Sequence, residues 1–141
     1  MIQRVQTLWM LLAAATILLT LKFSFYSGTL SNGTLVSANT FHSLVATDNF
    51  ILMVLTSALG TAVLINIFLF KHRPVQFRIC IIAILAELLL LFLFYRQTKL
   101  YINGTLDIWA IFHLVTIISL IFAARGIYKD EKLIKDSNRL R

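Results

Sequence analysis

The stretch Phe77-Arg-Ile-Cys-Ile-Ile-Ala-Ile-Leu-Ala-Glu-Leu-Leu-Leu-Leu-Phe-Leu-Phe-Tyr95 decides the fold. It is a hydrophobic run with a single acid, Glu87, near its centre. As a helix rising ~1.5 Å per residue, a run of this length crosses the ~30 Å hydrocarbon core of a bilayer. The protein is therefore expected to be built around a membrane, with one carboxyl group inside it.

The composition of the whole chain points the same way. It is 59% hydrophobic and only 13% charged, with a mean hydropathy of +0.85, whereas soluble domains are about 45–50% apolar and about 25% charged. The 141 residues leave room for one unit that is mostly spent on crossing the bilayer, and none for a separate soluble catalytic domain. The one cysteine, Cys80, lies inside the apolar run, where it is expected to act as a small hydrophobe.

Three further apolar runs predict an all-α membrane protein with four transmembrane helices in an up-down bundle, forming a single polytopic domain over 1–141. The expected spans are about 6–22, 50–70, 77–95 and 108–124. The first run also resembles a signal peptide. However, its small residues lie in the middle of the run, and Trp9 stands where an interfacial anchor would, so a retained first span is preferred.

Two connections contain Asn-Gly pairs, which supply the backbone of tight turns. In the long polar loop 23–49, Asn32-Gly33 lies between two apolar-polar alternations and predicts a small β-hairpin. A two-stranded hairpin alone is marginal, so it would need the bilayer surface, another loop or a partner to hold it. Asn103-Gly104 predicts a second turn between the third and fourth spans.

The tail 125–141 is a mixed-charge helix candidate. It is either a solvated continuation of the fourth helix or an arm that docks a protein partner or lipid headgroups. The residues expected to carry docking are Lys129, Asp130, Glu131, Leu133, Ile134, Arg139, Leu140 and Arg141.

The positive charge is unevenly distributed along the chain. Four spans would put both termini on one side, and ten of the thirteen Lys and Arg residues fall on that side. The other three are Lys22, Arg96 and Lys99. The positive-inside rule therefore predicts cytoplasmic termini and external Asn-Gly loops. Anionic lipid headgroups are the nearest counter-charge for these basic residues, so the net charge of +7 does not predict a nucleic-acid partner.

Several polar residues are expected within the bilayer. Placing each span by its ends puts Glu87 near the midplane and His113 close enough to reach its carboxyl group. Thr56-x-x-x-Gly60 is a small-xxx-small pattern, for which close helix packing within this chain is preferred over a dimer face. The predicted intramembrane polar set is Glu87, His113, Thr16, Thr56, Ser57, Thr116 and Asn66.

Glu87 has two interpretations, because an ionised carboxylate in hydrocarbon costs at least ~2.5 kcal/mol even on lenient insertion scales. In the first, Glu87 and His113 form a proton-titratable pair in a carrier. In the second, which we prefer, a neutral Glu87 hydrogen-bonds a Thr or His between helices, a contact typically worth ~0.6 kcal/mol. The sequence contains no recognised catalytic motif and its three histidines are far apart, so we expect no enzyme, cofactor or metal site.

The two ends of the chain carry a resemblance. Met1-Ile-Gln-Arg-Val-Gln-Thr7 and Lys129-Asp-Glu-Lys-Leu-Ile-Lys-Asp-Ser-Asn-Arg-Leu-Arg141 resemble a family of small four-span membrane proteins of unknown function from Bacteroidetes-type bacteria. The resemblance extends through the Lys71 to Arg78 turn and covers essentially the whole chain. It implies the inner membrane of a bacterium with two membranes and periplasmic Asn-Gly loops, and it implies no catalytic residues.

The sequence therefore favours a non-enzymatic subunit or accessory protein of a larger inner-membrane complex, embedded in the lipid bilayer. Its external loop and cytoplasmic tail would be the contact surfaces for a membrane-protein partner, because an arm with defined charged and apolar positions is typical of docking. The alternative is a small proton-coupled carrier that uses the Glu87 and His113 pair.

Overall fold

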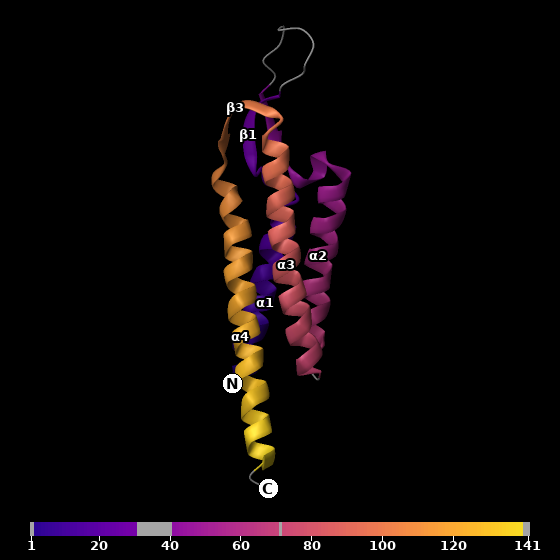
Figure 1. Cartoon of the computed structure of the whole chain (residues 1–141), viewed down its shortest axis with the longest axis vertical. Coiled ribbons are helices and arrows are strands. Elements are labelled where there is room, and N and C mark those ends of the chain that lie inside the picture. The colour runs from indigo at the N-terminus through magenta and orange to yellow at the C-terminus, as the bar shows by residue number, and fades with distance from the viewer. Residues whose placement is uncertain (1, 31–40, 71, 140–141) are drawn as a thin grey trace.

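The computed structural model describes residues 2–30, 41–70 and 72–139. Four helices make up most of it: α1 (Ile2–Leu19), α2 (Phe50–Phe68), α3 (Arg73–Thr98) and α4 (Ile111–Arg139). They lie side by side in an elongated bundle with a small sheet at one end (Figure 1). We call this the sheet end; the opposite end, where α1 begins and α4 finishes, is the tail end.

Three of the helices are long and apolar enough to cross a membrane. They are α2, α3 and α4, the last counted from the short 3₁₀ turn Ile108–Ala110 that leads into it. The apolar part of α1, Val5–Leu19, is shorter. The predicted helical, membrane-compatible fold is confirmed to this extent, and a bundle of four spans with the first at 6–22 stays a prediction.

The apolar stretch of α3 is extended at both ends by polar residues. The helix begins at Arg73 and ends at Thr98, beyond the predicted 77–95. Pro74 does not lie between α2 and α3 but in the first turn of α3. A proline is tolerated in that position because the N–H it lacks would have no partner within the helix.

The buried residues of α3 form one regular stripe along its inner face. Its buried residues recur every three or four positions, the spacing of one helix face: Gln76, Cys80, Ala83, Glu87, Leu90 and Phe94. The opposite face exposes Ile82, Leu85 and Leu89. Apolar side chains on the outside and polar ones within the stripe suit a helix whose surroundings are lipid.

Neighbouring helices pack in a ring. Each helix contacts the one that follows it in the chain, and α4 closes the ring against α1. Gly60 of α2 is buried, and a Cβ atom placed on it would lie 2.7 Å from Cδ2 of Leu18 in α1. The Thr56-x-x-x-Gly60 face of α2 thus packs closely against α1 of the same chain.

The sheet has three antiparallel strands in the order β2-β1-β3. Strands β1 (Tyr26–Leu30) and β2 (Phe41–Leu44) form the predicted hairpin, whose expected turn at Asn32-Gly33 lies outside the described residues. The third strand, β3 (Tyr101–Leu106), comes from the other Asn-Gly connection, so another loop does hold the hairpin.

The predicted turn at Asn103-Gly104 is wrong. Both residues lie inside β3, at a register shift opposite Ser27 to Thr29 of β1. Asn103 has a φ of 52°, a conformation that asparagine tolerates better than most residues. Here it bends an edge strand rather than reversing the chain. The shift brings the strands so close that a Cβ on Gly28 would lie 2.6 Å from Cα of Gly104.

The tail is helical and continues α4 without a break. The helix runs from Ile111 to Arg139, and in Figure 1 its last turns extend past the ends of the other helices at the tail end. The fourth predicted span and the tail are therefore one element.

Candidate functional sites

Glu87 and His113 meet in the middle of the bundle. His113 Nδ1 lies 2.6 Å from Glu87 Oε1, and both side chains are at most 2% exposed. The pair joins α3 to α4, as the depth argument predicts. Two forms of the pair would be net neutral, a carboxylic acid with a neutral imidazole or a carboxylate with an imidazolium. Both forms avoid leaving an uncompensated charge inside the bundle, which would be strongly destabilising.

Two aromatic rings cover this pair from the sheet end. Phe25 and Phe94 make edge contacts with the His113 ring at centroid distances of 5.4 and 5.1 Å, and lie 4.8 Å from each other. Phe25 directly precedes β1, so the residue that leads into the sheet is in contact with the buried pair. The rings fix the imidazole orientation and separate it from the surface.

Hydrogen bonds hold Phe25 in place. Its N–H donates to the Leu44 carbonyl at 2.8 Å, and its carbonyl accepts from the Asp107 N–H at 3.1 Å. The Asp107 carboxylate in turn accepts from the hydroxyls of Ser24 and Ser27. The polar residues at the sheet end thus position an apolar cover over the buried pair.

The predicted threonines divide into two kinds. Thr16 of α1 and Thr116 of α4 are hydrogen-bonded at 2.8 Å between their hydroxyl oxygens, both buried. Thr56 is fully buried, and its hydroxyl has no hydrogen-bond partner within residues 2–30, 41–70 and 72–139. Ser57, from the same predicted intramembrane set, lies closer to the surface of the bundle. It is half-buried, and its hydroxyl donates to the Met53 carbonyl of its own helix at 2.8 Å.

Asn66, a member of the predicted polar set, forms a hydrogen bond between helices, and Gln76 returns a second one. Asn66 Nδ2 donates to the backbone carbonyl of Gln76 at 3.2 Å, and Gln76 Nε2 donates to the backbone carbonyl of Asn66 at 3.1 Å. Asn66 Nδ2 also lies 3.3 Å from Cys80 Sγ, so the cysteine acts as a weak acceptor within the core. These contacts fasten α2 to α3 near the tail end.

A third polar contact at the tail end joins three helices. Gln6 Nε2 of α1 donates to Asp130 Oδ2 of α4 at 2.7 Å, and the Arg73 guanidinium of α3 lies 3.8 Å from the same oxygen. Asp130 is only 6% exposed. We call these three residues the tail latch. Asp130 was expected on the docking surface, and the structure instead uses it to attach α4 to the bundle.

The other predicted docking residues differ in exposure. Lys129 and Leu133 are exposed, whereas Glu131 is half-buried and has an interaction of its own. The side chains of the remaining four lie outside what the structure describes: Ile134, Arg139, Leu140 and Arg141.

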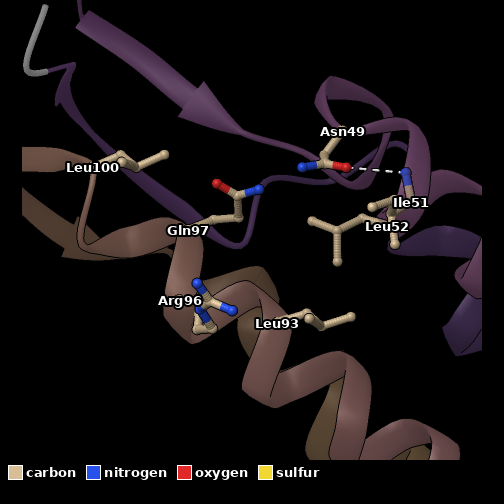
Figure 2. Close-up of a pocket in the computed structure, with 7 residues that line it drawn as sticks. All are labelled: Asn49, Ile51, Leu52, Leu93, Arg96, Gln97 and Leu100. Carbon is tan, nitrogen blue, oxygen red and sulfur yellow. Dashed lines mark hydrogen bonds between the residues drawn. The ribbon is translucent and has the colours of Figure 1, made fainter.

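A cleft opens at the sheet end between the start of α2 and the end of α3, as Figure 2 shows. Its volume is about 290 Å³. Three of its side chains are polar and the other four are aliphatic, and together they define the outer cleft: Asn49, Arg96, Gln97, Ile51, Leu52, Leu93 and Leu100. A neighbouring hollow is lined by His42, Asp48 and Tyr101, and it shares Asn49, Gln97 and Leu100 with the outer cleft.

The chain matches one family over nearly its whole length. The family DUF4293, described as a domain of unknown function, matches residues 2–140. The chain belongs to this family. The expected membership of an uncharacterised family is thereby confirmed. No curated protein and no solved structure matches the chain. The family description assigns no chemistry, so the activity of this DUF4293 member has to be argued from its own side chains.

Sequence reasoning missed the tail latch and the outer cleft. It also missed the contact of Gln76 with Asn66, although the sequence indicates that Gln76 is buried. Gln76 precedes Cys80 by four positions and Glu87 by eleven, on the same stripe of α3. Gln6 and Asp130 are 124 residues apart in sequence, and helical periodicity within one span does not reveal that contact. The outer cleft depends on the angle between two helix ends, which no local pattern specifies.

Proposed function

We propose that the protein is a non-enzymatic subunit or accessory factor of a larger complex in the inner membrane of a bacterium with two membranes. All four helices cross the bilayer, both termini are cytoplasmic, and the sheet end faces the periplasm. This orientation rests on the charge distribution. At the tail end, the start of α3 and the last turns of α4 carry Arg73, Arg78, Arg125, Lys129 and Lys132; at the sheet end, the basic residues around the ends of α1 and α3 are Lys22, Arg96 and Lys99.

The observation that carries the proposal is the continuation of α4 beyond the bundle. The helix stays unbroken to Arg139, past the last turns of the other helices (Figure 1). Isolated helices in water are marginal because most helical stability comes from packing. A projecting helix with charged residues and an exposed Leu133 is therefore suited to gain its packing from a second protein.

The sheet end offers a second contact surface. Because the strand order is β2-β1-β3, the outer edges of β2 and β3 have no strand partner within the described residues. Phe41, Leu106 and Ile108 are each more than 65% exposed there. Unpaired strand edges with apolar neighbours favour addition of a strand from another chain. This is the surface that we assign to the periplasmic side of the complex.

The experiment is a mild-detergent purification of an N-terminally tagged chain from its own host, analysed by quantitative mass spectrometry. We compare the full chain with a chain that ends at Lys132. This truncation removes the projecting part of α4 and keeps the tail latch, whereas a cut after Lys129 would also remove Asp130. A partner present at near-stoichiometric amounts with the full chain, and reduced at least tenfold with the truncation, supports the proposal.

The full-length Asp130→Asn variant is the matched control, because it weakens the latch without shortening the helix. We expect it to keep the partner. If the full chain purifies alone, or if the truncation keeps its partner in full, the tail is not the docking surface and the proposal fails in this form.

The second candidate is a small proton-coupled carrier, favoured by one observation, the 2.6 Å contact between Glu87 and His113. The second carboxyl oxygen, Oε2, is buried and has no hydrogen-bond partner in the part of the chain that the structure describes. Proteoliposomes loaded with a pH dye test it. Proton flux that is abolished by Glu87→Gln, in a protein that still melts as wild type does, would favour the carrier over the subunit.

A further inference from the structure

We propose that the outer cleft binds the phosphate-bearing headgroup of an anionic phospholipid from the leaflet at the sheet end, with the first part of an acyl chain on its aliphatic side chains. This site is separate from the docking surfaces of the proposed function and does not depend on them.

Three groups that donate hydrogen bonds border the cleft. Asn49 Oδ1 accepts from the Ile51 N–H at 3.0 Å, so its Nδ2 is the group that remains for the cleft. Figure 2 shows the side-chain amides of Asn49 and Gln97 and the Arg96 guanidinium around the same space. Within the described residues, neither Arg96 nor Gln97 has a side-chain hydrogen bond or ion pair with the protein. An occupant with several acceptor oxygens would satisfy all three.

The charge around the cleft favours an anion at the Arg96 side. None of its seven lining residues is acidic. Asp48 lines only the neighbouring hollow, where its carboxylate accepts the Val45 N–H at 2.7 Å. Because a guanidinium matches the oxygens of a phosphate with two parallel hydrogen bonds, Arg96 is the group that would hold the headgroup.

The aliphatic residues of the cleft, and its position at the end of the apolar part of α3, favour a lipid over a free ion. Leu52 and Leu93 form its apolar side, and Ile51 and Leu100 are more than half exposed at its rim. Arg96 directly follows Tyr95, an exposed aromatic at the end of the apolar α3, a place typical of the headgroup region. At about 290 Å³ the cleft takes a headgroup and the start of a chain, and an inorganic phosphate would leave its aliphatic side unused.

The test is native mass spectrometry of the full chain in mild detergent with phosphatidylglycerol, phosphatidylcholine or inorganic phosphate added. Arg96→Gln removes the guanidinium. Lys99→Gln is the matched control, because it removes an equal charge three residues later, at a side chain that lies over the Tyr95 ring and does not line the cleft. We expect Arg96→Gln to reduce bound phosphatidylglycerol about tenfold, the scale of one charged hydrogen-bonding contact, and Lys99→Gln to change it less than about twofold.

A second variant guards against misfolding. Gln97→Ala removes one neutral donor, and we expect a smaller loss, about threefold, with an unchanged melting temperature. Equal losses in Arg96→Gln and Lys99→Gln would mean general attraction to basic residues and would overturn the site. So would phosphatidylcholine binding as well as phosphatidylglycerol. Displacement of the lipid by millimolar inorganic phosphate would overturn the lipid assignment and leave a phosphate site.

Discussion

The 2.6 Å contact between Glu87 Oε1 and His113 Nδ1 predicts how substitutions at position 87 behave. Glu87→Gln can still hydrogen-bond the imidazole, so it should change the free energy of unfolding by less than about 1 kcal/mol. Glu87→Leu leaves the His113 Nδ1 atom buried without its observed partner, which costs about 1–3 kcal/mol. Melting of the purified protein in detergent measures both.

Leu88 is the control for this prediction, because it is the exposed residue beside Glu87 on α3. Leu88→Gln should have little effect on packing within the bundle. If Glu87→Leu melts as wild type does, the pair does not stabilise the fold, and a role in transport becomes the reason for its presence.

At the scale of elements, the contact between α1 and α2 depends on the size of one residue. The Cβ of Gly60→Ala meets only side-chain atoms, Cδ2 and Cγ of Leu18 at 2.7 and 3.1 Å and Cγ2 of Ile17 at 3.5 Å, so this change should cost less than a larger residue would. Gly60→Val adds two further carbons to that contact and should cost about 1–3 kcal/mol, the range for overpacking. Ala62→Val, on the exposed face of the same helix, is the matched substitution, and equal melting of the two Val variants would contradict the packing.

The sheet makes a parallel prediction at the register shift. A Cβ on Gly28 meets backbone atoms of Gly104, which cannot move aside as a side chain can. We expect Gly28→Ala to reduce hydrogen-exchange protection of the amides in β1 and β3 at least tenfold. Ser43→Ala, at an exposed position of β2, should leave that protection within about twofold. Unchanged protection in Gly28→Ala would show that β1 and β3 do not approach as described.

Single elements were predictable from the sequence to the extent that local chemistry defines them. The apolar length of 77–95 predicts α3, and the alternation around Asn32-Gly33 predicts β1 and β2. The third strand was not predictable, because Tyr26 pairs with Leu106 across most of the chain and Asn103-Gly104 has the residues of a turn. The contact between Glu87 and His113 was predictable from the sequence, because the depth of a residue in a span can be counted from the ends of that span. The contact of Gln6 with Asp130 was not, because it depends on how each helix is rotated about its axis.

At the scale of the whole molecule, the orientation in the membrane can be tested by labelling. In a Cys80→Ala background, Lys99→Cys and Lys132→Cys place single thiols at the two ends of the bundle. We expect an impermeant maleimide to label Lys99→Cys in intact spheroplasts, and to label Lys132→Cys only after permeabilisation. The reverse pattern would invert the proposed topology, and labelling of both in intact cells would mean that the helices do not separate the two ends.

The most direct test of the docking subunit is photocrosslinking in native membranes, with a benzoylphenylalanine in place of Leu133 on the projecting helix. Leu85, exposed on the apolar outer face of α3, is the comparison position. We expect one discrete adduct with a different protein from position 133, also recovered when that protein carries the tag, and only lipid adducts from position 85. No adduct from position 133, or an adduct only with a second copy of this chain, would contradict the proposal that α4 docks a partner.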